Sequence, residues 1–248
     1  MEKKSINNYL IAGSIVIIVL VLVVAGELTQ SKSCNDSPSE KVSILMDRSE
    51  PYMSALQAEE VELRVRRVLD NAQDNALITV FFMTKNGFDP SKELSVCKPA
   101  TKINPLFGDP QEAFKKFKRS VIQKAIETIN QPIAVAPESP IAETLSTLIA
   151  TDPLITTDSA GNLIPVKLHI FSDLVQNSKS ASLYDCPPFP NMEKLNNLGI
   201  PEKLNRFSSV AKIHIHQIRR DKTVKNQPSS TCIRKFWSFI SNPDWEDL

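Results

Sequence analysis

Hydrophobic and polar residues alternate in blocks along the chain, and each block predicts a strand or a helix. Short apolar runs predict strands at residues 42–46, 76–83, 94–97, 166–171 and 210–218. Apolar positions at helical spacing predict helices at residues 51–72, 110–130, 140–150, 191–197 and 232–240. Because strands separated by helices typically form βαβ units, the pattern predicts an α/β fold with a doubly wound, mainly parallel sheet.

The longest apolar run lies before these blocks, at residues 10–25, and carries no charge. As a helix it would extend roughly 24 Å, which is the short end of a membrane span. We therefore predict a transmembrane signal anchor at residues 9–26 after a short cytoplasmic N-terminus at residues 1–8; the alternative is a cleaved signal peptide. Lys3 and Lys4 precede the run and Glu27 follows it. The positive-inside rule then places the rest of the chain outside the cytoplasm.

The remaining chain divides into a linker and a domain. Residues 27–41 are mostly polar and Ser-rich and predict a flexible linker, and residues 42–248 form the domain with its C-terminal helix. Four cysteines, Cys34, Cys97, Cys186 and Cys232, fit an oxidising compartment. They allow three pairings, among which the sequence does not choose, and free buried thiols are the alternative.

Composition excludes several classes of function. The 248 residues include 29 Lys and Arg against 28 Asp and Glu, so the net charge of +1 gives no reason to expect nucleic acid. The six glycines never cluster, and neither of the glycine-loop nucleotide motifs, G-x-G-x-x-G and G-x-x-x-x-G-K-[ST], occurs in the sequence. G-x-S-x-G, H-E-x-x-H and C-x-x-C are absent as well. We therefore expect a protein that is not an enzyme.

Acidic and hydroxyl side chains follow two predicted strands. Asp47 and Ser49 follow the first strand, and Asp173 follows the strand at 166–171. Ser139 precedes the helix at 140–150, where it is also well placed as an N-cap with Pro140 at the first helical position. Ligands of open α/β sheets bind outside the carboxyl ends of the strands. These residues therefore predict an oxygen-only site of the kind that Mg²⁺ prefers, the alternative being that Asp47 only caps the following helix.

These segments resemble the von Willebrand factor A-like (vWA) family over about residues 41–220. The resemblance rests on an apolar run followed by Asp-x-Ser, an S/T-P-h-x-E-x-L helix opening, and h-h-h-x-S-D on a later strand. It implies a metal-ion-dependent adhesion site that binds Mg²⁺ or Mn²⁺ and is completed by an acidic side chain of a protein partner. The implied metal residues are Asp47, Ser49, Ser139 and Asp173, the last acting directly or through water.

The chain departs from the family pattern at two positions. Pro51 stands where the family has a second Ser, and Leu174 stands where Gly is common. The hydroxyl that Pro51 lacks leaves two alternatives open, in which water replaces the missing ligand or the site holds no metal.

A second resemblance is to membrane-anchored A-domain-like proteins associated with bacterial mobile elements. The Asp-x-Ser start, the stretch FSDLVQNSKSASLY at residues 171–184 and the late R-K-F-W helix carry it. It implies a single-pass protein of the bacterial inner membrane with a periplasmic domain.

Three functions follow from these features. The first is a protein-interaction module with a partly degenerate metal site, and the second is a metal-free structural subunit of an envelope assembly. The third is a phosphohydrolase that uses an aspartate after the first strand. Such an enzyme needs D-x-D at residues 47–49, but residue 49 is Ser, so the general acid/base carboxylate is missing. His214 and His216 share one strand face and could form a two-His zinc site, whereas His169 is expected to be a packing residue.

Overall fold

The computed structural model describes residues 37–47, 55–84, 87–88, 94–99, 110–129, 138–151, 157–184, 186–218, 228–241 and 243–247. The predicted anchor at 9–26, most of the linker, Ser49 and Pro51 lie outside these residues. Within the described ranges, no helix is long and apolar enough to cross a membrane.

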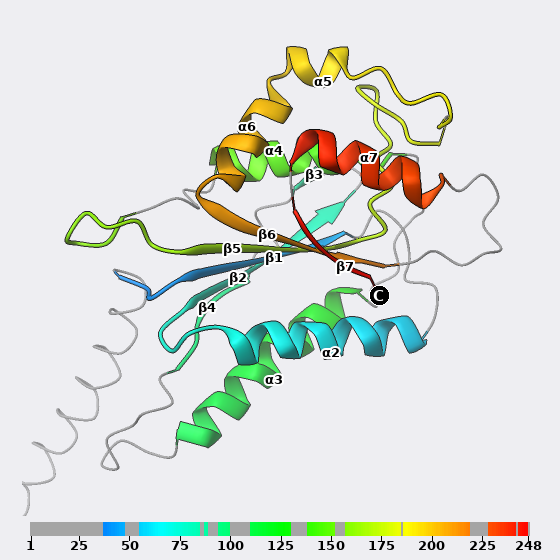
Figure 1. The fold of residues 1–248 in the computed structure, drawn as a ribbon. Coiled ribbons are helices and arrows are strands. Elements are labelled where there is room, and N and C mark those ends of the chain that lie inside the picture. The colour runs from blue at the N-terminus through cyan, green and yellow to red at the C-terminus, as the bar shows by residue number, and fades with distance from the viewer. Residues whose placement is uncertain are drawn as a thin grey trace, which may run out of the picture.

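In the described part of the chain, seven strands form one sheet, whose centre is parallel (Figure 1). Five of them pair in parallel in the order β2-β1-β5-β6-β7: β1 (Lys41–Asp47), β2 (Leu77–Thr84), β5 (Val166–Ser172), β6 (Ala211–Gln217) and β7 (Asp244–Asp247). The short strands β3 (Gly87–Phe88) and β4 (Leu94–Cys97) pair antiparallel with β2. The prediction of a mixed α/β fold with a mainly parallel sheet is therefore confirmed, and the order is consistent with a Rossmann-like or vWA-like arrangement.

Helices cover both faces of the sheet (Figure 1). The helices α2 (Ala55–Asn71) and α3 (Pro110–Ile129) lie on one face. The other face carries α4 (Ile141–Thr151), α5 (Glu193–Asn197), α6 (Ile200–Ser208) and α7 (Ser230–Ile240). We call these the α2 face and the α7 face. Two separate apolar cores result, one on each side of the sheet.

The order of the parallel strands reverses between β1 and β5. Counted along the chain, the five parallel strands stand in the order 2-1-3-4-5. Strand β2 pairs with one edge of β1. Strand β5, which comes later in the chain, pairs with the other edge of β1. In doubly wound sheets such a reversal opens a crevice at the carboxyl ends of the two strands, where ligands bind. The fold thus directs attention to the ends of β1 and β5.

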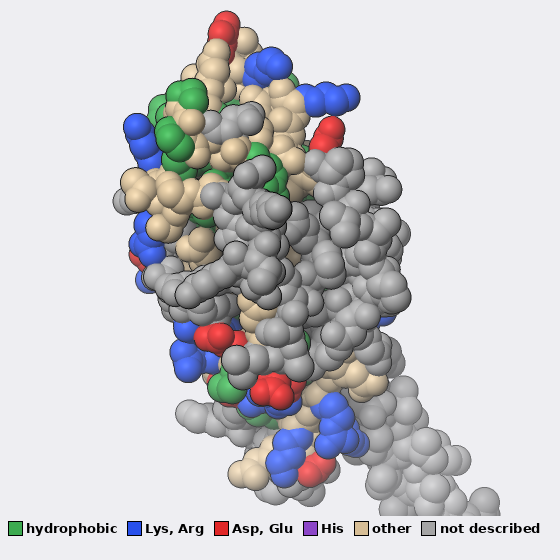
Figure 2. All heavy atoms as spheres, turned by 90° about the vertical axis from the view of Figure 1, so that its right-hand side faces the viewer, with side chains coloured by type: hydrophobic (Ala, Val, Ile, Leu, Met, Phe, Trp, Pro, Cys, Tyr) green, Lys and Arg blue, Asp and Glu red, His purple; other side chains and the backbone are tan. Residues whose placement is uncertain are grey.

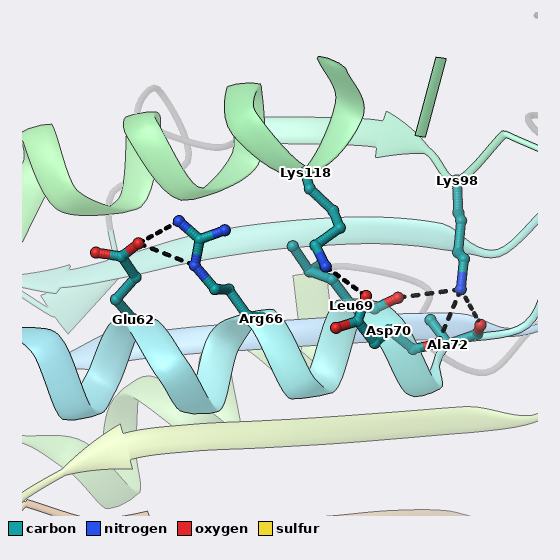
Figure 3. Close-up of polar contacts among 7 residues, drawn as sticks. All are labelled: Glu62, Arg66, Leu69, Asp70, Ala72, Lys98 and Lys118. Atoms are coloured by element: carbon teal, nitrogen blue, oxygen red, sulfur yellow. Dashed lines mark hydrogen bonds and ion pairs between the residues drawn. The ribbon is translucent and has the colours of Figure 1, made fainter. Parts of the chain in front are cut away.

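Lys98 caps the end of α2 on the α2 face (Figure 3). Its Nζ donates hydrogen bonds of 3.1 Å to the backbone carbonyls of Leu69 and Asp70 and a further one to that of Ala72. The last carbonyls of a helix have no partner within it, and the C-terminus is the negative end of the helix dipole, so a cation there stabilises it. Burial lowers the pKa of Lys98, against the opposing attraction of Asp74 and Asp70.

A disulfide also joins two parts of the domain. Cys186, after β5, is bonded to Cys232 in α7 across a sequence separation of 46 residues. Cys97 at the end of β4 is disulfide-bonded as well. In the chain-entropy model, closing the 46-residue loop between Cys186 and Cys232 stabilises the folded state by about 4 kcal/mol.

Candidate functional site

The carboxyl ends of β1 and β5 bring Asp47 next to Ser172. The two strands pair in parallel up to Met46 and Phe171, so the next residue on each strand is Asp47 and Ser172. Ser172 Oγ donates a hydrogen bond of 2.6 Å to Asp47 Oδ2, and both side chains are buried. Because a buried carboxylate is costly without hydrogen bonds, this contact stabilises Asp47 at the reversal of strand order between β1 and β5.

Asp173 follows at once and opens a tight loop. Its Oδ1 accepts a 2.9 Å hydrogen bond from the backbone N–H of Val175, and the N–H of Leu174 donates to Ser172 Oγ at 2.9 Å. Leu174 has φ of 63°, a left-handed conformation that costs a residue with a side chain about 1–2 kcal/mol. Its side chain is completely buried, and its carbonyl accepts a 3.0 Å hydrogen bond from Trp237 Nε1. Leu174 therefore keeps a backbone that suits Gly while it fills the core.

Ser139 reaches the same edge through its backbone. Its N–H donates to the carbonyl of Asn177 at 2.7 Å, and the N–H of Asn177 donates back at 2.9 Å. This bridge fastens the start of α4 to the loop after β5. The helix begins at Ile141, and the Pro140 carbonyl accepts from Thr144 N–H at 2.9 Å. Pro140 thus precedes the helix, and the prediction that it fills the first helical position was wrong by one residue.

Gln176 joins α4 to this loop and is the polar residue that sequence reasoning missed. It is completely buried, and its Oε1 accepts a 2.8 Å hydrogen bond from the N–H of Ala142 in the first turn of α4. Its Nε2 donates to Glu143 Oε2 at 2.8 Å and to Ser178 Oγ at 3.0 Å. Ser178 Oγ donates in turn to Glu143 Oε1 at 2.6 Å. The sequence offers no signal for it, because Gln176 opens the polar stretch Gln176-Asn177-Ser178 after the strand.

The arrangement can be compared with the ligands of a hard metal ion. Three of the four predicted ligands, Asp47, Ser139 and Asp173, lie at or beside the carboxyl edge, whereas Ser49 is outside the described residues. We call these three residues the acidic edge. Their carboxylate and hydroxyl oxygens are the donor type that Mg²⁺ and Mn²⁺ prefer, so the chemistry of the donors fits. The described part of the chain holds no group of three or more His, Cys, Asp or Glu side chains suited to a metal.

A second polar cluster lies on the α2 face of β5 and β6. His214 and His216 share that face with His169, whose Nδ1 lies 3.0 Å from His216 Nε2. The ring of His169 stacks on that of His214 at 4.7 Å between centroids, and the ring of His216 stacks on Phe171 at 4.3 Å. His169 is therefore part of a stack of rings across two strands. Since no metal group is found among the described residues, the two-His zinc site gains no support.

No protein-family model matches the chain, and a search of the curated proteins finds no match.

Proposed function

We propose that the chain is a membrane-tethered, vWA-like protein-interaction module that acts by binding and not by catalysis. The observation that carries this proposal is the acidic edge at the strand-order reversal, where doubly wound sheets bind their ligands. Asp47 ends β1 and Asp173 directly follows β5, the two strands that flank the reversal. Mg²⁺ or Mn²⁺ bound there would offer a coordination position to an Asp or Glu of a protein partner.

The proposed setting is outside the cytoplasm, in the periplasm of a bacterium, with residues 9–26 as the anchor. The disulfide between Cys186 and Cys232 supports an oxidising compartment, because structural disulfides persist there and are rare in the cytosol. An origin in a bacterial mobile element rests on the resemblance of residues 171–184 and of the R-K-F-W helix.

One observation favours a second function, a metal-free structural subunit of an envelope assembly. Asp47 Oδ2 already accepts a short hydrogen bond from the buried Ser172 hydroxyl, which is a role within the fold. If that is its whole role, Asp47 is retained for stability, and Pro51 marks the loss of a ligand. The two functions differ in whether the Asp47 carboxylate binds a metal ion when its hydrogen bond from Ser172 is absent.

The test is thermal unfolding of the full chain in detergent with Mg²⁺, with Mn²⁺ or with EDTA. A bound ion raises the apparent stability by RT ln(1 + [L]/Kd), about 2.7 kcal/mol at a hundredfold excess over Kd. We expect Asp47→Ala to abolish this rise.

Ser172→Ala is the matched control, because it removes the hydrogen bond to Asp47, together with the one from Leu174 N–H to Ser172 Oγ, and keeps the carboxylate. The interaction module predicts that Ser172→Ala retains the metal response. If wild type shows no metal response and the two variants are destabilised to a similar extent, the metal-free structural subunit is the better description.

A further inference from the structure

A cavity of about 230 Å³ lies between α2 and the α2 face of β5 and β6. Four cationic residues line it, Arg64 and Arg67 from α2 and Lys167 and Lys212 from the strands, together with the three stacked histidines. No carboxylate is found among the described residues that line it. We call it the basic cavity. It is separate from the acidic edge, none of whose residues line it.

The strand register concentrates positive charge in the basic cavity. Lys167 stands directly opposite Lys212, and two residues further on His169 stands opposite His214. Side chains two residues apart point to the same face of a strand, so both pairs face α2. Like charges directly opposite each other destabilise a sheet. The fold thus places two Lys residues side by side in the wall of the cavity, of which Lys167 is paired with Glu40, so that an anion beside Lys212 would be favourable.

Helix α2 supplies the facing wall. Arg64 and Arg67 are three residues apart, and Asn71 follows four residues later, so the three lie along one side of the helix. Arg66 belongs to the other side, toward α3, where its Nε donates a 2.9 Å hydrogen bond to Glu62 Oε1 (Figure 3). Guanidinium groups offer a planar fork of donors that matches phosphate oxygens.

Two carboxylates lie near the lining residues and offset part of the charge. Glu40 Oε2 is 2.7 Å from Lys167 Nζ, and Asp244 Oδ2 is 3.8 Å from His214 Nδ1. Asp244 is largely exposed, so solvent screens its attraction. Among the ion pairs of the described residues, two carboxylates thus stand against the four cations, and one of the two is weakly coupled. On the face drawn in Figure 2, described Lys and Arg side chains lie among Asp and Glu side chains.

The size of the basic cavity indicates a small anion. Pockets for drug-sized ligands measure ~300–1,000 Å³, and this cavity is smaller, at about 230 Å³. Burial, together with the neighbouring His216, His214 and Lys167, lowers the pKa of His169 to about 3. His169 is therefore neutral at pH 7, and the attraction for an anion comes from the Lys and Arg side chains.

We propose that the basic cavity binds a phosphate group, either as the free anion or as a phosphate monoester whose organic part lies outside. Arg64, Arg67, Lys167 and Lys212 supply the charge-assisted hydrogen bonds, and the imidazoles form the floor. The module would then have a second binding site, on the α2 face. This site takes an anion, whereas the acidic edge would take a metal cation.

The test measures the affinity of the full chain in detergent for inorganic phosphate, from the rise in unfolding temperature with phosphate concentration. Chloride at equal ionic strength is the reference, and EDTA removes any metal. Arg67 and Lys212 are exposed, so their variants keep the fold, which circular dichroism checks. We expect Arg67→Gln and Lys212→Gln each to weaken phosphate binding about tenfold or more, the loss of one charge-assisted hydrogen bond.

Arg66→Gln is the matched control, because it removes the same charge from the neighbouring position on the other side of α2. It is expected to leave phosphate affinity unchanged. Glycerol 3-phosphate is the second probe: binding of both probes assigns the phosphate group of a larger molecule, and binding of phosphate alone assigns the free anion. Absence of stabilisation beyond that by chloride, or an equal loss of affinity in Arg66→Gln, would overturn the proposal.

Discussion

The strands β5 and β6 present two very different faces. On the α7 face their side chains are Leu168, Ile170, Ile213 and Ile215, and all four are buried beneath helices. On the α2 face the same strands carry Lys167, Lys212 and the three histidines, with the buried Phe171 near the end of β5. Period-two alternation thus gives one pair of strands a dry side and a charged side. The apolar α7 face stabilises the fold, and the charged α2 face is available for binding a ligand.

The largest expected effect comes from deleting side chains on the α7 face. Ile215 is completely buried, so Ile215→Ala should lower the free energy of unfolding by about 2–5 kcal/mol, since burial is lost and a cavity remains. His214→Ala, the adjacent residue on the α2 face, should cost less than about 1.5 kcal/mol, because His214 is only half-buried. Urea unfolding of the two variants measures the difference. Equal losses would mean that the two faces are packed alike.

The next effect is a pH dependence that arises on the α2 face. The pKa of His169 is about 3 in the folded protein, because of burial first and of nearby positive charge second, and about 6.5 when unfolded. Between these values the unfolded chain binds a proton that the folded chain does not. Stability from His169 is therefore complete above about pH 6.5 and is lost as the pH falls toward 3, by up to about 3 kcal/mol at pH 4.

This pH dependence is measured by urea unfolding of wild type and of His169→Asn across pH 7 to 4. The variant should lose less stability over this range than wild type does. The charged and titratable groups around His169 are present in both proteins: His214, His216, Lys167, Lys212, Arg64 and Arg67. Parallel pH profiles would contradict a suppressed protonation of His169.

The smallest effect concerns the Lys pair. Lys212→Glu replaces repulsion of Lys167 by attraction, so the variant should be more stable than wild type by about 0.2–1 kcal/mol at low salt. The gain should shrink as salt is added, because the pair is partly exposed. Lys203→Glu makes the same charge change on α6, on the other face, and should not stabilise. A gain of equal size in both variants would trace the effect to net charge.

Most elements of the fold followed from the apolar pattern, and the exceptions have physical causes. The strand at 94–97 and the helix at 110–130 match β4 and α3 to within a residue. Helix α6 was missed, although Gly199 before it and Pro201 in its first turn are start signals. Strand β7 was missed because its sequence DWED is acidic and unlike a strand, and only pairing with β6 extends it.

The sites depended on information that periodicity does not contain. Strand ends indicated Asp47 and Asp173, but the contact of Asp47 with Ser172 requires β1 and β5 to be neighbours, which is a matter of strand order. His214 and His216 were expected on one face, yet His169 joins them only because β5 pairs with β6. Non-local pairing therefore determines both candidate sites, whereas local sequence identifies only the residues available.

The hydrogen bond from Trp237 to Leu174 makes the acidic edge optically observable. The indole of Trp237 is nearly inaccessible to solvent, and its N–H is bound to the carbonyl that follows Asp173. Any ligand that moves this loop must change the surroundings of that indole and hence its ultraviolet emission. In a Trp245→Phe background, where Trp237 is the single tryptophan, the protein thus carries an intrinsic fluorophore on α7 that reports events at the ends of β1 and β5, with no label attached.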